Sequence, residues 1–115
     1  MVAQVHELAD MQTSPTAWLF EGGPRGMRAD VSFFVTHTPP GRGPGLHVHP
    51  YPEVFLVQEG TATFRAGGDE LVVTAGQVVV VPPDTPHGFK NSGEGTLRQV
   101  SIHPSAEVRQ TWLEE

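Results

Sequence analysis

The sequence predicts an all-β domain, and three observations support this. Six short runs rich in β-branched and aromatic residues recur along a chain of 115 residues. Each run ends in a cluster of glycine, proline, serine or acidic residues that favours a turn. Short strands at this spacing are typical of an antiparallel sandwich or small barrel, and the length suits one domain, residues 1–115.

The expected strands are residues 31–37, 53–58, 61–65, 71–74, 78–81 and 97–102. Residues 78–81 are four consecutive valines, so this strand is expected to be covered on both faces. The core covers one face, and a neighbouring chain or a terminal segment covers the other. The tail, residues 105–115, is predicted to form a short C-terminal helix with Ser105 as its N-cap.

The composition indicates which binding partners and which cellular location to expect. The chain has no cysteine, which excludes disulfides and thiolate ligands. A net charge of −6 disfavours nucleic acid as a partner. Residues 1–11 contain no apolar run, so neither a signal peptide nor a membrane span is expected, and a cytoplasmic location is the default. The valine run, with Trp112 and Leu113 in the tail, predicts a homodimer, because large apolar patches mark interfaces.

Three histidines and one carboxylate form the most informative pattern. On an extended strand His47 and His49 project to the same side, because successive side chains alternate. Glu53 keeps this parity if the bend between them preserves register, and His87 arrives from another strand. Three neutral nitrogens and one hard oxygen suit one divalent transition metal ion, such as Fe, Mn, Ni, Cu or Zn.

The spacing around these residues resembles two sequence motifs of the cupin superfamily. In the first, Gly41 precedes the histidine pair by five residues, and Glu53 and Gly60 follow at fixed intervals. The second motif runs over residues 76–91, from Gly76 through Pro82, Thr85-Pro86 and His87 to Asn91. Asp84 stands where the family usually has glycine, and aspartate tolerates the left-handed backbone conformation.

This resemblance implies a small single-domain cupin, a double-stranded β-helix or jelly-roll barrel, with metal ligands at His47, His49, Glu53 and His87. It also implies a metal-dependent enzyme, of dioxygenase, isomerase or lyase type, that acts on a small organic acid, phenol or enolisable metabolite. The alternative is a non-catalytic cupin module that binds a metal or a metabolite. Four protein ligands leave about two positions of a six-coordinate ion open, which favours the enzyme.

Other residues are candidates for proton transfer and for substrate contact. Glu53 or a non-ligand histidine such as His37 could act as acid or base, because the chain lacks cysteine and a serine elbow. Strand parity would place Phe55 beside Glu53, and Arg98 inward with Val100.

Two more residues complete the expected substrate-contacting set. Phe33 shares the parity of His37, and Tyr51 lies in the bend before Glu53 with a phenol that could transfer a proton. His6 and His103 are interpreted as ordinary hydrogen-bonded histidines.

Overall fold

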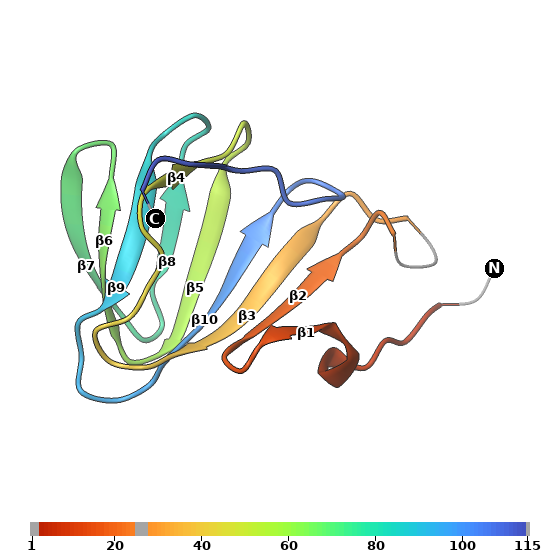
Figure 1. The fold of residues 1–115 in the computed structure, drawn as a ribbon, viewed down its shortest axis with the longest axis horizontal. Coiled ribbons are helices and arrows are strands. Elements are labelled where there is room, and N and C mark those ends of the chain that lie inside the picture. The colour runs from red at the N-terminus through yellow and green to blue at the C-terminus, as the bar shows by residue number, and fades with distance from the viewer. Residues whose placement is uncertain (1–2, 25–27, 115) are drawn as a thin grey trace.

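The computed structural model describes residues 3–24 and 28–114, and these fold into two antiparallel sheets (Figure 1). One short 3-10 helix, η1 (Leu8–Met11), precedes the strands. The strands are β1 (Gln12–Ser14), β2 (Ala17–Glu21), β3 (Ser32–Thr38), β4 (His47–Val48), β5 (Glu53–Glu59), β6 (Thr61–Ala66), β7 (Asp69–Thr74), β8 (Val78–Val81), β9 (His87–Asn91), β10 (Leu97–His103) and β11 (Thr111–Trp112). The all-β prediction is confirmed.

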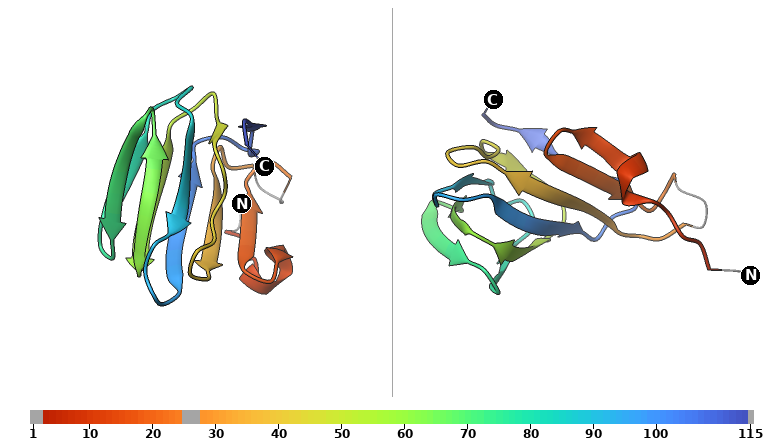
Figure 2. Two further views of the ribbon diagram at one scale, coloured as in Figure 1. Left: turned by 60° about the vertical axis from the view of Figure 1, so that its left-hand side comes forward. Right: turned by 90° about the horizontal axis from the view of Figure 1, so that it is seen from below.

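The sheets differ in size and together enclose the core. The six-stranded sheet has the order β1-β2-β3-β10-β5-β8, and the five-stranded sheet has the order β11-β4-β9-β6-β7. Figure 2 shows the sheets as two facing layers. Alternate residues of β5, β6 and β10 point between them and form the core cluster, which includes Phe55, Val57, Phe64 and Leu97.

The motif glycines take backbone conformations that other residues avoid. Gly41, Gly60 and Gly76 all have positive φ angles, between 79° and 93°. Asp84, where the motif usually has glycine, has a φ of 57° and is the one described non-glycine residue with positive φ. The predicted tolerance of aspartate at this turn is therefore confirmed.

The N-terminal part of the chain adds two strands that the sequence analysis did not predict. β1 and β2 form a hairpin, and β2 pairs with β3 from Ala17↔Thr36 to Glu21↔Ser32. The hairpin extends the larger sheet beyond β3 (Figure 1).

The predicted C-terminal helix is wrong. The tail runs extended from β10, and β11 pairs with β4 at Thr111↔Val48 and Trp112↔His47. The backbone N–H groups of Leu113 and Glu114 donate to the carbonyl of Leu46. Pairing with the otherwise open edge of β4 satisfies these backbone groups, and an isolated helix of this length is marginal in water.

The valine strand β8 is covered on one face only within the chain. Val79 and Val81 are buried, but Val78 and Val80 are 58% and 63% exposed on the outer face of the larger sheet. The sequence analysis expected either a terminal segment or a neighbouring chain to cover this outer face. No terminal segment among the described residues covers it. None of the described helices is long and apolar enough to cross a membrane.

The homodimer stays a prediction, and the outer face of the larger sheet is where we expect it to form. Val80→Lys should convert a dimer to a monomer at micromolar concentration, because a lysine there would be buried unpaired. Light scattering measures this. Val72→Lys is the matched control, because Val72 is 68% exposed on β7 of the other sheet. A wild-type protein that is monomeric would contradict the prediction.

Candidate metal centre

The four predicted ligands come together from both sheets. His47 lies on β4 and pairs across the strand with His87, the first residue of β9. His49 follows β4, and Glu53 begins β5 in the larger sheet. All four side chains are at most 6% exposed, and one potential ligand atom of each lies within 4.8 Å of the others. The predicted same-side placement of His47 and His49 is confirmed.

Backbone carbonyls fix the orientation of all three imidazoles. The Nδ1 atom of His47 lies 2.8 Å from the carbonyl oxygen of Gly45, and that of His87 lies 2.8 Å from the carbonyl of Thr85. The Nδ1 atom of His49 lies 2.7 Å from the carbonyl of Arg109. A carbonyl oxygen can only accept, so each Nδ1 carries the hydrogen. Each neutral ring therefore presents the lone pair of Nε2, which is the atom left to bind a metal.

These Nε2 atoms meet the carboxylate of Glu53. Its Oε1 atom lies 2.8 Å from Nε2 of His87 and 2.9 Å from Nε2 of His49. Nε2 of His49 is buried without a hydrogen-bond partner among the described residues. A carboxylate oxygen and a neutral Nε2 are both acceptors, so this arrangement is stable only with a cation between them, a proton or a metal. The donor set fits a divalent transition metal.

The pKa values of the site show how burial and the neighbouring groups act on each side chain. Burial alone would raise the pKa of Glu53, but the close contacts with His103, His49 and His87 outweigh it and hold the pKa of this carboxyl well below its usual range. Burial lowers the pKa of His47. Burial also acts to lower the pKa of His87, but its bonds to Glu53 and Thr85 outweigh this and raise it. A proton on His87 and a metal ion therefore compete for the same lone pair.

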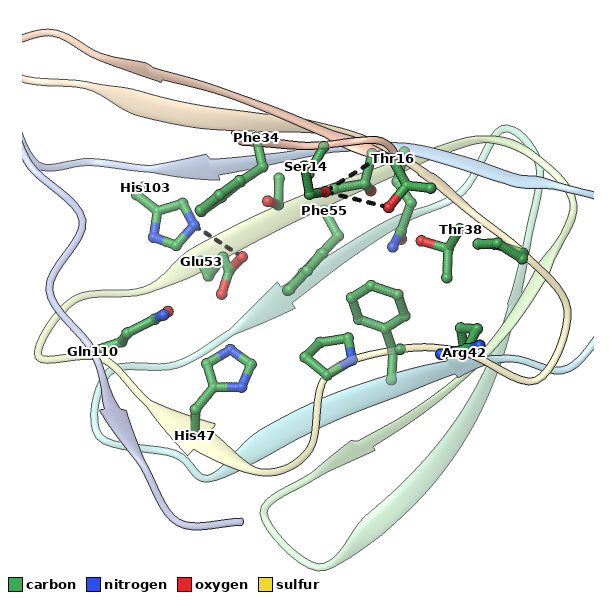
Figure 3. A pocket seen from close by; sticks show the side chains of 18 of the residues that line it. Ser14, Thr16, Phe34, Thr38, Arg42, His47, Glu53, Phe55, His103 and Gln110 are labelled. Carbon is green, nitrogen blue, oxygen red and sulfur yellow. Dashed lines mark hydrogen bonds and ion pairs between the residues drawn. The ribbon is translucent and has the colours of Figure 1, made fainter. Parts of the chain in front are cut away.

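A fourth histidine contacts Glu53 from the opposite side. Nε2 of His103 lies 3.1 Å from Oε2 of Glu53 (Figure 3), and its Nδ1 atom lies 2.7 Å from the Tyr51 hydroxyl. The backbone N–H of Arg109 donates to the same hydroxyl oxygen, over 3.1 Å. Burial raises the pKa of Tyr51, and its hydroxyl oxygen already accepts from Arg109, so the phenol is placed to donate a hydrogen bond to Nδ1 of His103.

His103 consequently carries its own hydrogen on Nε2, the reverse of the three ligand histidines. Nε2 of His103 is close enough to hold Oε2 of Glu53 and leave Oε1 for a metal, although the two atoms are not aligned for a hydrogen bond in this structure. We therefore assign His103 and Tyr51 the role of positioning Glu53. The sequence analysis did not identify His103 as a site residue. Its parity with Gln99 and Ser101 was the available signal, since a run of polar residues on one strand face marks a site rather than core.

Three residues expected in the pocket lie outside it. His37 and Phe33 are on the outer face of β3, where His37 contacts Trp18 with ring centroids 4.9 Å apart. Arg98 is exposed on the outer face of β10, with Nε 2.8 Å from Oε2 of Glu59 and Nη1 3.0 Å from Nε2 of His37. The expectation that these side chains point inward is wrong. The inward orientation of Arg98 was inferred from the apolar residues that share its parity, such as Val100. In the structure these residues lie on the outer face of β10, which is itself partly apolar.

A cavity of about 740 Å³ opens from the metal centre. His47, Glu53 and His103 line one end of it, as Figure 3 shows. Phe55 lines it as placed from sequence, although its contact with substrate stays a prediction. Tyr51 does not line the cavity and instead supports His103. The walls also include Trp112 of β11, whose ring contacts His47 with centroids 4.8 Å apart.

Fold and site together define a two-sheet β protein with a buried cluster of three histidines and one carboxylate, beside a cavity that opens to solvent. The sequence model described as Cupin domain matches residues 34–103, and the chain belongs to this family. No curated protein sequence matches it.

Among solved structures, the fold is similar to oxalate decarboxylase of Bacillus subtilis. A single-substitution mutant of that enzyme matches with a TM-score of 0.83 at 19% identity, over 94% of this chain and 31% of the other. A structure from a study of its Mn(II) centres matches with a TM-score of 0.80 at 20% identity, over 92% of this chain and 31% of the other. The chain spans about a third of the length of these relatives, and at this identity the likeness shows the fold alone.

One prediction from this geometry concerns metal content. The purified protein should hold about one divalent metal ion per chain, and His49→Ala or His87→Ala should lose it, because each removes one converging lone pair. Elemental analysis of protein prepared without chelator or affinity resin measures this. His37→Ala is the matched control, since His37 lies on the outer face. Full metal content in the double variant His47→Ala, His49→Ala would show that other residues bind the metal.

Another prediction concerns the positioning pair. Tyr51→Phe and His103→Ala should weaken metal binding about 10- to 100-fold while the site still fills at high metal concentration, because Glu53 loses its fixed orientation. Competition with a chelator of known affinity measures this. His103→Gln, which can still donate to Glu53, should recover part of the loss. Equal affinities in wild type and His103→Ala would contradict the assigned role.

Proposed function

We propose that this protein is a metal-dependent enzyme that acts on a small organic acid, phenol or enolisable metabolite through direct coordination of the substrate to the metal. One observation carries the proposal: three imidazoles and one carboxylate converge, and two of these residues, His47 and Glu53, line one end of a cavity large enough for an organic ligand. A purely structural site needs no such cavity.

Each ligand residue would have a defined part in holding the ion. His47, His49 and His87 would bind it through Nε2, and Glu53 through Oε1, while His103 holds Oε2. The bound ion would act as a Lewis acid with about two positions open to a chelating anion. The similar solved structures include an enzyme described as having Mn(II) centres, which supports a metal such as Mn in this site.

Residues that do not bind the metal would orient the substrate and the ligand Glu53. Phe55 lies beside the centre and is buried against Phe64 and Phe89, so it would exclude water and position the substrate. His103 lines the same end of the cavity, with Nε2 3.1 Å from Oε2 of Glu53, so it would keep the carboxylate in place when a substrate binds. No cysteine exists to act as a nucleophile.

The proposal is tested with metal-loaded protein against a panel of small 2-oxo acids, 2-hydroxy acids and phenols. Oxygen consumption would identify a dioxygenase, and new products without oxygen uptake would identify an isomerase or lyase. Glu53→Gln should lower both metal affinity and turnover, whereas Phe55→Leu should change substrate preference with metal content intact. If ligands shift the absorption of a Co²⁺-loaded sample but none is turned over, the proposal of an enzyme is wrong. The protein would then be a metabolite-binding module.

A further inference from the structure

The cavity contains a buried amide group that the metal centre does not use. Gln99 is 1% exposed, lines the cavity, and its Oε1 atom has no hydrogen-bond partner among the described residues. A buried acceptor without a partner opposes folding, because it loses its hydrogen bonds to water and gains none in exchange. The position therefore fits a ligand that brings a hydrogen-bond donor.

Gln99 lies on the same strand as His103, the residue that contacts Glu53, but farther from the proposed metal ligands. His103 and Gln99 are four residues apart on β10, with Ser101 between them, and all three point inward. Four residues of β-strand span about 13 Å, so a ligand that reaches from the metal to the Gln99 amide has to be about 10 Å long. A two-carbon dicarboxylate such as oxalate covers only a fraction of that distance.

The walls between these two points are largely aromatic. Phe55, Phe89 and Phe34 line this stretch, and Phe34 and Phe89 are only half-buried, so parts of their rings face the cavity. Phe55 and Phe89 meet edge to face, with centroids 6.0 Å apart. Such surfaces favour a flat aromatic body, because ring pairs gain from offset and edge-to-face contacts.

Charge in the cavity also disfavours a small dianion. Among the described lining residues, Arg42 is the one permanently cationic side chain, and Figure 3 shows it at the end opposite Glu53 and His103. A second carboxylate next to the metal would face aromatic rings instead of a cation, with its charge desolvated.

We propose that the ligand of this cavity is an elongated aromatic acid that chelates the metal through two oxygens at one end and donates a hydrogen bond to Gln99 from the other. The inference rests on the proposed function for the chelating end only. The Gln99 end follows from the cavity itself.

The test measures binding to Co²⁺-loaded protein by calorimetry and visible absorption. The probes are oxalate, pyruvate, phenylpyruvate and 4-hydroxyphenylpyruvate, whose ring hydroxyl lies at the far end from the chelating oxygens. Phenylpyruvate should bind about tenfold or more tighter than pyruvate or oxalate, because the ring leaves water. The hydroxyl should add about a further five- to tenfold.

Gln99→Leu should remove the gain from the hydroxyl and leave both the affinity for phenylpyruvate and the Co²⁺ content unchanged. Gln99→Met is a second variant in case the first fails to fold. Arg98→Leu is the matched control, because Arg98 is the adjacent residue on the same strand but points outward. Oxalate or pyruvate binding as tightly as phenylpyruvate, or a hydroxyl gain that persists without Gln99, would overturn the inference.

Failure of the proposed function gives a different result. If no acid changes the Co²⁺ absorption, the metal chemistry is wrong. The cavity is then tested alone with 3-(4-hydroxyphenyl)propanoate, which lacks the 2-oxo group, on metal-free protein. Binding that is weakened by Gln99→Leu supports the Gln99 end, and absence of binding overturns it.

Discussion

The candidate metal centre depends on hydrogen bonds between backbone carbonyls and the Nδ1 atoms of three histidines. Two of the carbonyls are local: Gly45 and Thr85 each precede their histidine by two residues. The third belongs to Arg109, sixty residues after His49. These bonds fix the tautomer of each ring and direct Nε2 at Glu53, so the geometry exists before any ion binds. Without them, each ring would rotate, and the converging lone pairs would be lost.

The tail beyond β10 is consequently part of the site. The residue Arg109 uses both backbone groups there, since its carbonyl accepts from His49 and its N–H donates to Tyr51. Farther along, Glu114 accepts from the N–H of Leu46 and pairs with Arg65, with Nη2 2.6 Å from Oε1. These contacts hold the tail against β4, and Trp112 then lies on the ring of His47. A helix over the same residues would withdraw the backbone groups that orient the centre.

The features predicted correctly from the sequence are those that follow from local periodicity. The alternation of His47 and His49 follows from strand geometry, whereas the approach of Glu53 depends also on the bend before it, and the structure confirms that these side chains meet. The inner face of β10 could not be inferred in this way, because it faces the cavity and carries polar residues such as Gln99. Pairing between distant segments caused the other errors. The β1–β2 hairpin and β11 exist because the edges of β3 and β4 accept another strand, and no local pattern shows which edge lacks a partner.

The buried cluster of histidines and Glu53 does not stabilise the fold by itself. Glu53 is a carboxylate that is only 3% exposed, surrounded by imidazoles, and the Nε2 atoms of two of them, His49 and His103, have no hydrogen-bond partner among the described residues. Burying such groups is costly, and apolar residues of similar volume would often stabilise a fold at least as well. Elsewhere between the two sheets the core is built that way, from phenylalanine, valine and leucine. A local arrangement that opposes folding, next to a cavity with an unpaired amide, is the signature of a site shaped for a ligand rather than for packing.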